Sequence, residues 1–169
     1  MAKYLKHDGV GGIKEENGLH TSSGAGDSGK IIETDATGRI DSSILPVGIG
    51  DDAALLEASE NLSAGDFINI WNDGGTAKVR KADATTNGMI CKGFVLSAVT
   101  TGNDAKVYFE GTNTQLSGMT PGSVIFLSTT AGAKTETVPS ATGNIVQRLG
   151  VAISDTELTF ESQQPIELI

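Results

Sequence analysis

Apolar and polar residues alternate along much of the chain after residue 62, with the period of two that is typical of half-buried β-strands. Residues 67–71 and 77–81 show this alternation on either side of Asn72-Asp73-Gly74-Gly75, which predicts a hairpin with one solvated face. Residues 94–99 and 105–110 predict a second hairpin, because the residues between them are rich in turn formers. The pattern therefore indicates antiparallel strands in this part of the chain.

This pattern is repeated 57 residues further along, where residues 119–154 align with residues 62–97 without a gap. Eight of the 36 aligned positions carry the same residue, and the apolar positions follow the same order. The identical residues are Gly65 and Gly122, Ile68 and Ile125, Gly75 and Gly132, Ala84 and Ala141, Thr85 and Thr142, Asn87 and Asn144, Gly93 and Gly150, and Ser97 and Ser154. Because no nucleophile, base or metal ligand is repeated, the duplication favours a structural or binding protein over an enzyme.

The second copy predicts hairpins within residues 124–138 and 150–161, which brings the total to about eight short strands. The 22 glycines and the aromatic content of only 5% agree with many tight turns and few large anchors. We therefore predict an all-β fold, a small antiparallel β-barrel or sandwich with internally duplicated hairpin units, over residues 51–169. Residues 51–60 fit either a short helix or a connecting strand, and the sequence leaves both open.

Residues 1–50 differ from the rest because glycine and polar residues are scattered through them without an amphipathic period. Such a segment buries too little apolar surface to offset its chain entropy, so we predict an extended N-terminal arm that orders on a partner. Aliphatic residues recur in the second half of the arm and are the candidate partner-binding residues. They are Ile31, Ile32, Ile40, Ile44, Leu45 and Val47.

The net charge of -9 argues against binding to a phosphate backbone, since no Lys/Arg cluster is present to release counterions. Nowhere do about 18 apolar residues run together, so no membrane partner is expected. Cys91 is the only cysteine, which excludes an intrachain disulfide and predicts a small buried apolar residue in a protein made in a reducing cytoplasm.

The segment Gly24-Ala25-Gly26-Asp27-Ser28-Gly29-Lys30 has the spacing of a nucleotide-binding P-loop, but its context differs. No apolar strand precedes it, and Ile31 stands where the magnesium-binding hydroxyl is required. His7 and His20 are the only histidines, and neither has a second ligand at metal-binding spacing. We therefore expect no catalytic residues, no cofactor and no metal site, and we predict that the protein is not an enzyme.

Residues 29–46 resemble a G-K-h-h-x-x-D-x-x-G-x-h-x-x-S-x-L-P stretch common in virion proteins of tailed bacteriophages, where h is apolar. Residues 58–70 are similar to the start of the small β-domains in those proteins, and residues 150–169 are similar to the ends of phage capsid decoration (cement) and head fibre proteins. The resemblance implies a homotrimer that docks on the outer capsid surface of the virion. It further implies an arm that clamps the major capsid protein of neighbouring capsomers, and it transfers no catalytic residue.

Two other functions remain open from the sequence. One is a phage tail or head fibre component, in which the arm attaches to the virion and the β-domain faces outward. The other is a carbohydrate-binding surface module, although Trp71 is the only tryptophan and the chain has just 2 tyrosines as further stacking platforms.

Overall fold

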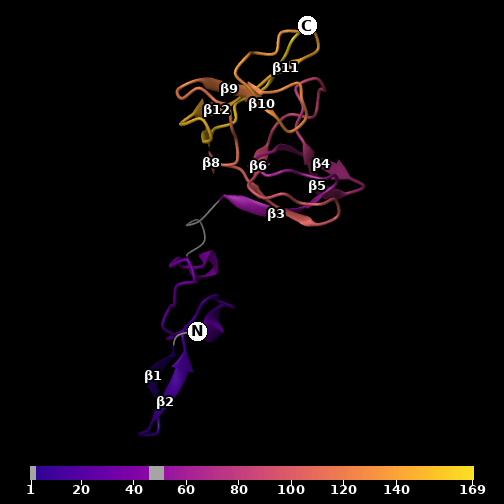
Figure 1. Cartoon of the computed structure of the whole chain (residues 1–169). Helices are drawn as coiled ribbons and strands as arrows, with labels where there is room; N and C mark the ends of the chain where they lie inside the picture. Colours follow the sequence, from indigo (N-terminus) through magenta and orange to yellow (C-terminus); the bar gives the residue numbers. More distant parts are fainter. Residues whose placement is uncertain (1–2, 46–51) are drawn as a thin grey trace. The chain divides into compact units, whose positions relative to one another are not determined.

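The computed structural model describes residues 3–45 and 52–169, and the chain folds as two compact units, residues 1–50 and 51–169 (Figure 1). The prediction of an all-β fold is confirmed, since the regular structure of the described residues consists of short strands and two 3-10 turns. Val47, one of the candidate binding residues, lies outside the described residues.

The N-terminal unit begins with a hairpin that the prediction of an extended arm did not include. Strands β1 (Lys3–His7) and β2 (Ile13–Asn17) pair in antiparallel register. The Asp8 carboxylate closes the turn by accepting hydrogen bonds from the amides of Val10 and Gly12, at 2.9 and 2.8 Å. Two 3-10 turns follow, η1 (Ala25–Asp27) and η2 (Ser42–Ile44). The hairpin was hard to predict from the sequence because half of the residues in its two strands are charged.

The C-terminal unit contains twelve strands in its described residues, which is more than the eight predicted. In chain order they are β3 (Ala53–Ala58), β4 (Phe67–Asp73), β5 (Thr76–Lys81), β6 (Gly93–Val95), β7 (Asp104–Tyr108), β8 (Gly111–Asn113), β9 (Val124–Leu127), β10 (Lys134–Thr135), β11 (Ile145–Val146), β12 (Arg148–Ala152), β13 (Leu158–Phe160) and β14 (Ile166–Glu167). Each of the four predicted hairpins is present as an antiparallel pair. For residues 51–60 the strand is correct and the helix is wrong, since β3 pairs with β7 over five positions and this pairing overrides the local helix propensity.

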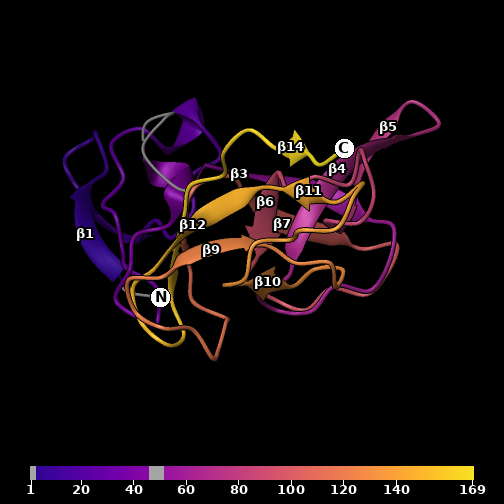
Figure 2. The same cartoon turned by 90° about the horizontal axis from the view of Figure 1, so that it is seen from above.

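The duplication extends over five strands in each copy, one strand further in both directions than the sequence alignment. The first copy forms a closed barrel in the order β3-β7-β6-β4-β5, and the second forms a sheet in the matching order β8-β13-β12-β9-β10. Figure 2 shows β9 beside β12 in the second sheet, which corresponds to β4 beside β6 in the first. The register is also the same, because Ile68 faces Gly93 in the first copy and Ile125 faces Gly150 in the second.

This register explains why Gly93 and Gly150 are both glycines. A Cβ atom on Gly93 would lie 2.5 Å from the carbonyl oxygen of Tyr108 on the neighbouring strand. A Cβ atom on Gly150 would collide with the carbonyl oxygen of Thr159 in the same way. At these two repeated positions any larger residue forces the strands apart, so the repeat retains the glycine.

The two copies bury their apolar residues differently. Successive side chains of a strand point to opposite faces, so Ile68 fills the interior of the first barrel while Phe67 points out of it. Phe67 and Phe94 then pack against the second sheet, where both rings contact Phe160 at centroid distances of 6.0 and 5.3 Å. The outer face of the first copy therefore covers the inner face of the second, and the C-terminal unit has one core inside the barrel and one between the copies.

The second sheet does not close into a barrel, because residues of the first copy lie where its two edge strands, β8 and β10, would pair. In the barrel, β3 and β5 close the ring by pairing Glu57 with Lys78 and Ala58 with Val79. In the second sheet, by contrast, the backbone at Gln115 lies against Gly65, and the buried Asn113 side chain donates a hydrogen bond to the Gly65 carbonyl at 3.0 Å. Contact with the first copy thus replaces the pairing that would close the second.

A buried glutamine fixes the two copies to each other. The Gln147 side chain accepts a hydrogen bond from the Cys91 amide at 2.8 Å and donates one to the Cys91 carbonyl at 2.9 Å. Both residues are buried, so these bonds replace a strand pair between a loop of the first copy and a strand end of the second.

Replacing Gln147 with Leu should destabilise the C-terminal unit, because it leaves the buried Cys91 amide without its partner. A buried unsatisfied group costs about 1–3 kcal/mol, which should be visible as a lower midpoint in urea unfolding of the full chain. Gln164→Leu, at an exposed position, is the matched control and should unfold like the wild type. Equal midpoints for Gln147→Leu and wild type would contradict this role.

Candidate partner-binding surface

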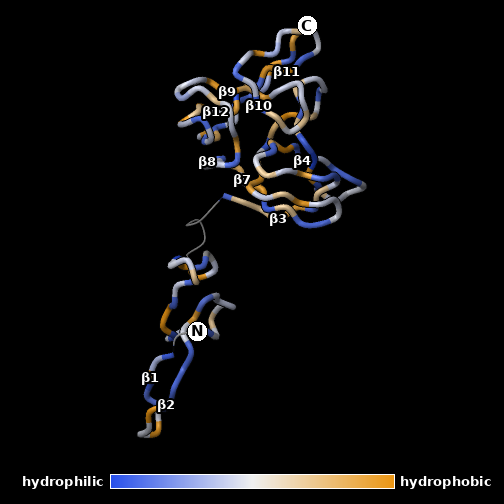
Figure 3. Tube along the Cα trace, viewed as in Figure 1, coloured by the Kyte–Doolittle hydropathy of each residue, from blue (hydrophilic) through white to orange (hydrophobic). Residues whose placement is uncertain are grey.

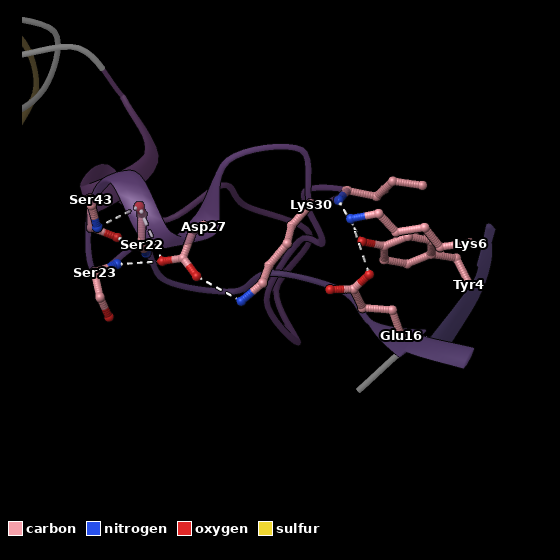
Figure 4. Close-up of polar contacts among 10 residues, drawn as sticks. Tyr4, Lys6, Glu16, Ser22, Ser23, Asp27, Lys30 and Ser43 are labelled. Atoms are coloured by element: carbon pink, nitrogen blue, oxygen red, sulfur yellow. Dashed lines mark hydrogen bonds and ion pairs between the residues drawn. The ribbon is translucent and has the colours of Figure 1, made fainter. Parts of the chain in front are cut away.

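The candidate surface lies in the N-terminal unit and starts from the segment that holds Ile31 and Ile32. Leu19 forms a parallel bridge with Ile32: the Leu19 amide donates to the Ile31 carbonyl at 2.9 Å, and the Glu33 amide donates to the Leu19 carbonyl at 3.0 Å. The Ile31 amide also donates to the Tyr4 hydroxyl on β1, at 3.3 Å (Figure 4). The backbone of this segment is therefore held on one side, while the side chains of Ile31 and Ile32 remain 56% and 49% exposed.

A hollow of about 280 Å³ lies beside this segment. Ile32 and Ile44, both predicted binding residues, line it together with Leu19, which the sequence had not singled out. Its remaining lining residues are Ser22, Gly24, Ala25, Asp27, Ser28 and Lys30. Residues that are 25 positions apart in the sequence thus form one apolar floor with a polar rim.

The rim carries an ion pair between Lys30 and Asp27, whose charged atoms lie 2.7 Å apart. Asp27 also accepts a hydrogen bond from the Ser23 amide at 2.7 Å, and together these bonds hold the pKa of its carboxyl below the ordinary value, with Lys30 as the main cause. The same pair raises the pKa of Lys30. Within the segment that has P-loop spacing, Lys30 therefore pairs with Asp27 of the same turn, where a P-loop lysine would contact phosphate.

Three of the other predicted residues, Ile31, Ile40 and Leu45, do not line the hollow. Ile40 and Leu45 are exposed, and Val47 lies outside the described residues. Instead, the structure adds an apolar group that sequence reasoning missed: Leu5, Val10 and Ile13 of the β1-β2 hairpin are largely exposed, Val10 at 90%. Figure 3 shows hydrophobic colour at the end of this hairpin. The turn formers between Asp8 and Gly12 were the available sequence signal for it.

Hydrogen bonds to aspartate carboxylates, and not a buried core, hold the turns of this unit. No residue of 3–41 or 43–45 is buried, yet four carboxylates each accept bonds from backbone amides of the turn that follows or surrounds them. These are Asp8, Asp27, Asp35 and Asp41. Hydrogen bonding to the charged form lowers the pKa of all four, for Asp35 chiefly through the Thr37 hydroxyl and for Asp41 chiefly through Ser43.

The structure gives little support for a metal site, a reactive thiol or an aromatic stacking platform. Within the described parts of the chain, no three His, Cys, Asp or Glu side chains gather as a metal site requires. Cys91 is buried as predicted, and burial raises the pKa of its thiol to about 12. Trp71 donates to the Ser59 hydroxyl at 3.1 Å, and the Arg80 guanidinium lies 4.9 Å from its ring centre, so one ring face is already occupied. No helix in residues 3–45 or 52–169 is long and apolar enough to cross a membrane.

No protein-family model matches the chain, and no curated protein is significantly similar to it.

Acid should unfold the turns of the N-terminal unit that depend on ionised aspartates. A carboxyl with a lowered folded pKa stabilises the fold above its unfolded pKa of about 3.9, and this stabilisation is lost as pH falls through the folded value. We expect the backbone NMR shifts of residues 35–39 to move toward random-coil values as the pH falls below about 3.9.

Asp35→Asn is the matched control for this titration, because the amide oxygen still accepts from the Thr37 and Arg39 amides but does not titrate. In this variant the shifts of the 35–39 turn should stay constant over the same pH range. Wild-type shifts that do not change down to pH 2 would contradict the carboxylate role.

Proposed function

We propose that the chain is a bacteriophage virion structural protein, a capsid decoration (cement) protein that binds the outer capsid surface through its N-terminal unit. The observation that carries this proposal is the contrast between the two units. The C-terminal unit buries two apolar cores, whereas the described part of the N-terminal unit buries no residue and still has an ordered backbone. An ordered unit with exposed aliphatic side chains and no core of its own is suited to docking on another protein.

The partner in this proposal is the major capsid protein. Ile31, Ile32 and Ile44 supply the contact, with Ile40, Leu45 and Val47 extending it along the chain. A fully buried isoleucine gives roughly 1.5–3 kcal/mol, before the cost of association is subtracted. Many copies on one shell would add these contacts across capsomer seams and so stabilise the capsid against the pressure of packaged DNA.

The acidic surface agrees with this placement. The net charge of -9 gives no attraction to nucleic acid, and it keeps a protein soluble that has to be present in many copies. The related alternative, a tail or head fibre component, uses the same N-terminal attachment but only a few copies for each virion. For the carbohydrate-binding alternative, Arg80 over the Trp71 ring removes one of the few stacking faces.

Undecorated capsids mixed with the purified full chain should bind it at near-stoichiometric occupancy of the surface lattice. The triple variant with Ile31, Ile32 and Ile44 replaced by Ser should fold but bind at least about 100-fold more weakly, which corresponds to about 3 kcal/mol lost over three side chains. Copies bound for each capsid, measured by cryo-electron microscopy and gel densitometry, test both points.

The matched control replaces three exposed aliphatic residues of the C-terminal unit, Leu55, Ile153 and Ile166, with Ser and should bind like the wild type. A few copies at a single vertex would instead favour the fibre component. Absence of binding to capsids, with binding to glycans on an array, would favour the carbohydrate-binding module.

We further propose that the protein is a homotrimer, as the resemblance to decoration proteins implies. Sedimentation equilibrium of the free full chain should then give three times the chain mass of 17.4 kDa. A monomer at all concentrations tested would overturn the trimer but would leave the attachment role of the N-terminal unit intact.

A further inference from the structure

The loop between β5 and β6 contains Asn87 followed by Gly88, and both residues are exposed. Because glycine has no Cβ atom, its amide nitrogen can approach the side chain of the preceding residue without obstruction. The space beside Gly88 is also open, since a Cβ atom placed there would meet no other atom. Among the described residues, the Gly88 amide has no hydrogen-bond acceptor. This nitrogen is therefore available to react with the Asn87 side chain.

The second copy holds the corresponding asparagine in a protected setting. Asn144 occupies the position of Asn87 in the alignment of the two copies, but Ile145 follows it in place of glycine. The Ile145 amide donates to the Ala84 carbonyl at 2.7 Å, and its branched side chain is buried. That amide has to break a hydrogen bond and leave a packed strand, β11, before it can approach Asn144. The two copies thus differ in the availability of the neighbouring amide.

The chain has one other Asn-Gly pair, Asn17 and Gly18, and its setting differs as well. Asn17 ends β2 and pairs with Lys3, so its backbone is held extended. The Glu33 side chain packs against Gly18, where it lies 2.5 Å from the place of a Cβ atom. Asn17 therefore has to leave a paired strand end before it can react, whereas Asn87 lies outside any strand.

We propose that Asn87 is a site of spontaneous deamidation with water as the only co-reactant. The Gly88 nitrogen attacks the side-chain carbonyl carbon of Asn87, and the new N–C bond closes a succinimide ring. The bond from that carbon to the side-chain nitrogen breaks, and the Gly88 amide proton passes through water to this nitrogen, which leaves as ammonia. Water then adds to one of the two ring carbonyls and opens the ring to aspartate or isoaspartate. One water is consumed for each ammonia released, and nothing is oxidised or reduced.

The reaction removes a bond between this loop and the C-terminal strand β14. The Asn87 side-chain nitrogen donates to the Glu167 carboxylate at 2.6 Å. Deamidation replaces this donor with a second carboxylate, which is ionised at neutral pH because the ordinary pKa of aspartate is about 3.9. The hydrogen bond is then lost and the two like charges repel each other. Backbone bonds, such as that from the Leu168 amide to the Asn144 carbonyl at 2.9 Å, are left to hold β14.

Incubation of the folded full chain at mildly alkaline pH, followed by peptide mapping with mass spectrometry, tests the reaction. Asn87 should convert before any other asparagine and at least about 10-fold faster than Asn144, because the Ile145 amide is engaged until the strand opens. Asn17 should also convert more slowly than Asn87. In guanidinium chloride this difference should disappear, since glycine follows both residues in the unfolded chain.

An unchanged Asn87 after Asn17 or Asn144 has converted in the folded chain would overturn the proposal. Equal rates for Asn87 and Asn144 in the folded chain would also overturn it, because the free Gly88 amide would then confer no advantage.

Asn87→Asp reproduces the aspartate product and tests the effect on β14. In this variant the Leu168 amide should exchange with deuterium at least about 3-fold faster than in the wild type, because the strand has lost its bond to the loop. Adding Glu167→Gln should restore the wild-type rate, since the glutamine amide can donate to the new carboxylate. Glu167→Gln alone is the matched control, because its side-chain oxygen still accepts from Asn87.

Unchanged exchange at Leu168 in Asn87→Asp would overturn the loosening of β14. Faster exchange that Glu167→Gln does not reverse would overturn its electrostatic cause. These measurements use the free chain, so their outcomes are independent of the proposed capsid attachment.

Discussion

The N-terminal unit holds its shape by hydrogen bonds without a buried core, and this constraint governs how the protein can work. Aspartate carboxylates fix its turns, and the Leu19 backbone and the Tyr4 hydroxyl hold the segment around Ile31. Each such bond contributes little in water, where solvent competes for the same groups. A unit built in this way gains stability when an apolar partner covers it and removes that competition, so binding and folding reinforce each other.

The C-terminal unit, by contrast, buries two apolar cores of its own. Its two copies share strand order and register but differ in closure. The first copy buries Ile68 within itself, while its Phe67 and Phe94 pack against the second. Phe67 stacks on Phe160 and Phe94 meets it edge-on, and these contacts together with the bonds of Gln147 to Cys91 join the copies into one body. Duplication thus gives a stable unit from short strands and few aromatic residues.

The sequence was sufficient to predict the all-β class, the four hairpins and the duplication, because alternating residues and turn formers act over a few positions. It did not predict that one copy closes while the other stays open. That difference depends on the contact of Gly65 with Gln115, 50 residues apart, for which no local pattern exists. For the candidate surface, Ile31 and Ile32 were predicted from the aliphatic residues of the segment, but the hollow required Leu19 and Ile44 to meet in space. The β1-β2 hairpin was missed because its stability comes from the Asp8 turn and not from an apolar stripe.

Pre-organisation distinguishes this surface from a fully flexible arm. Ordering a residue costs about 1–2 kcal/mol of backbone entropy, so an arm that orders only on its partner loses much of what its isoleucines gain. The bridge to Leu19 and the turns at Asp35 and Asp41 remove part of this cost before contact, since they already fix the backbone around Ile32, Ile40 and Ile44. In the proposed function, this lower cost lets a few half-exposed aliphatic side chains supply the affinity. Because the bonds that provide this order depend on ionised carboxylates, the proposed attachment should weaken in acid that neutralises them.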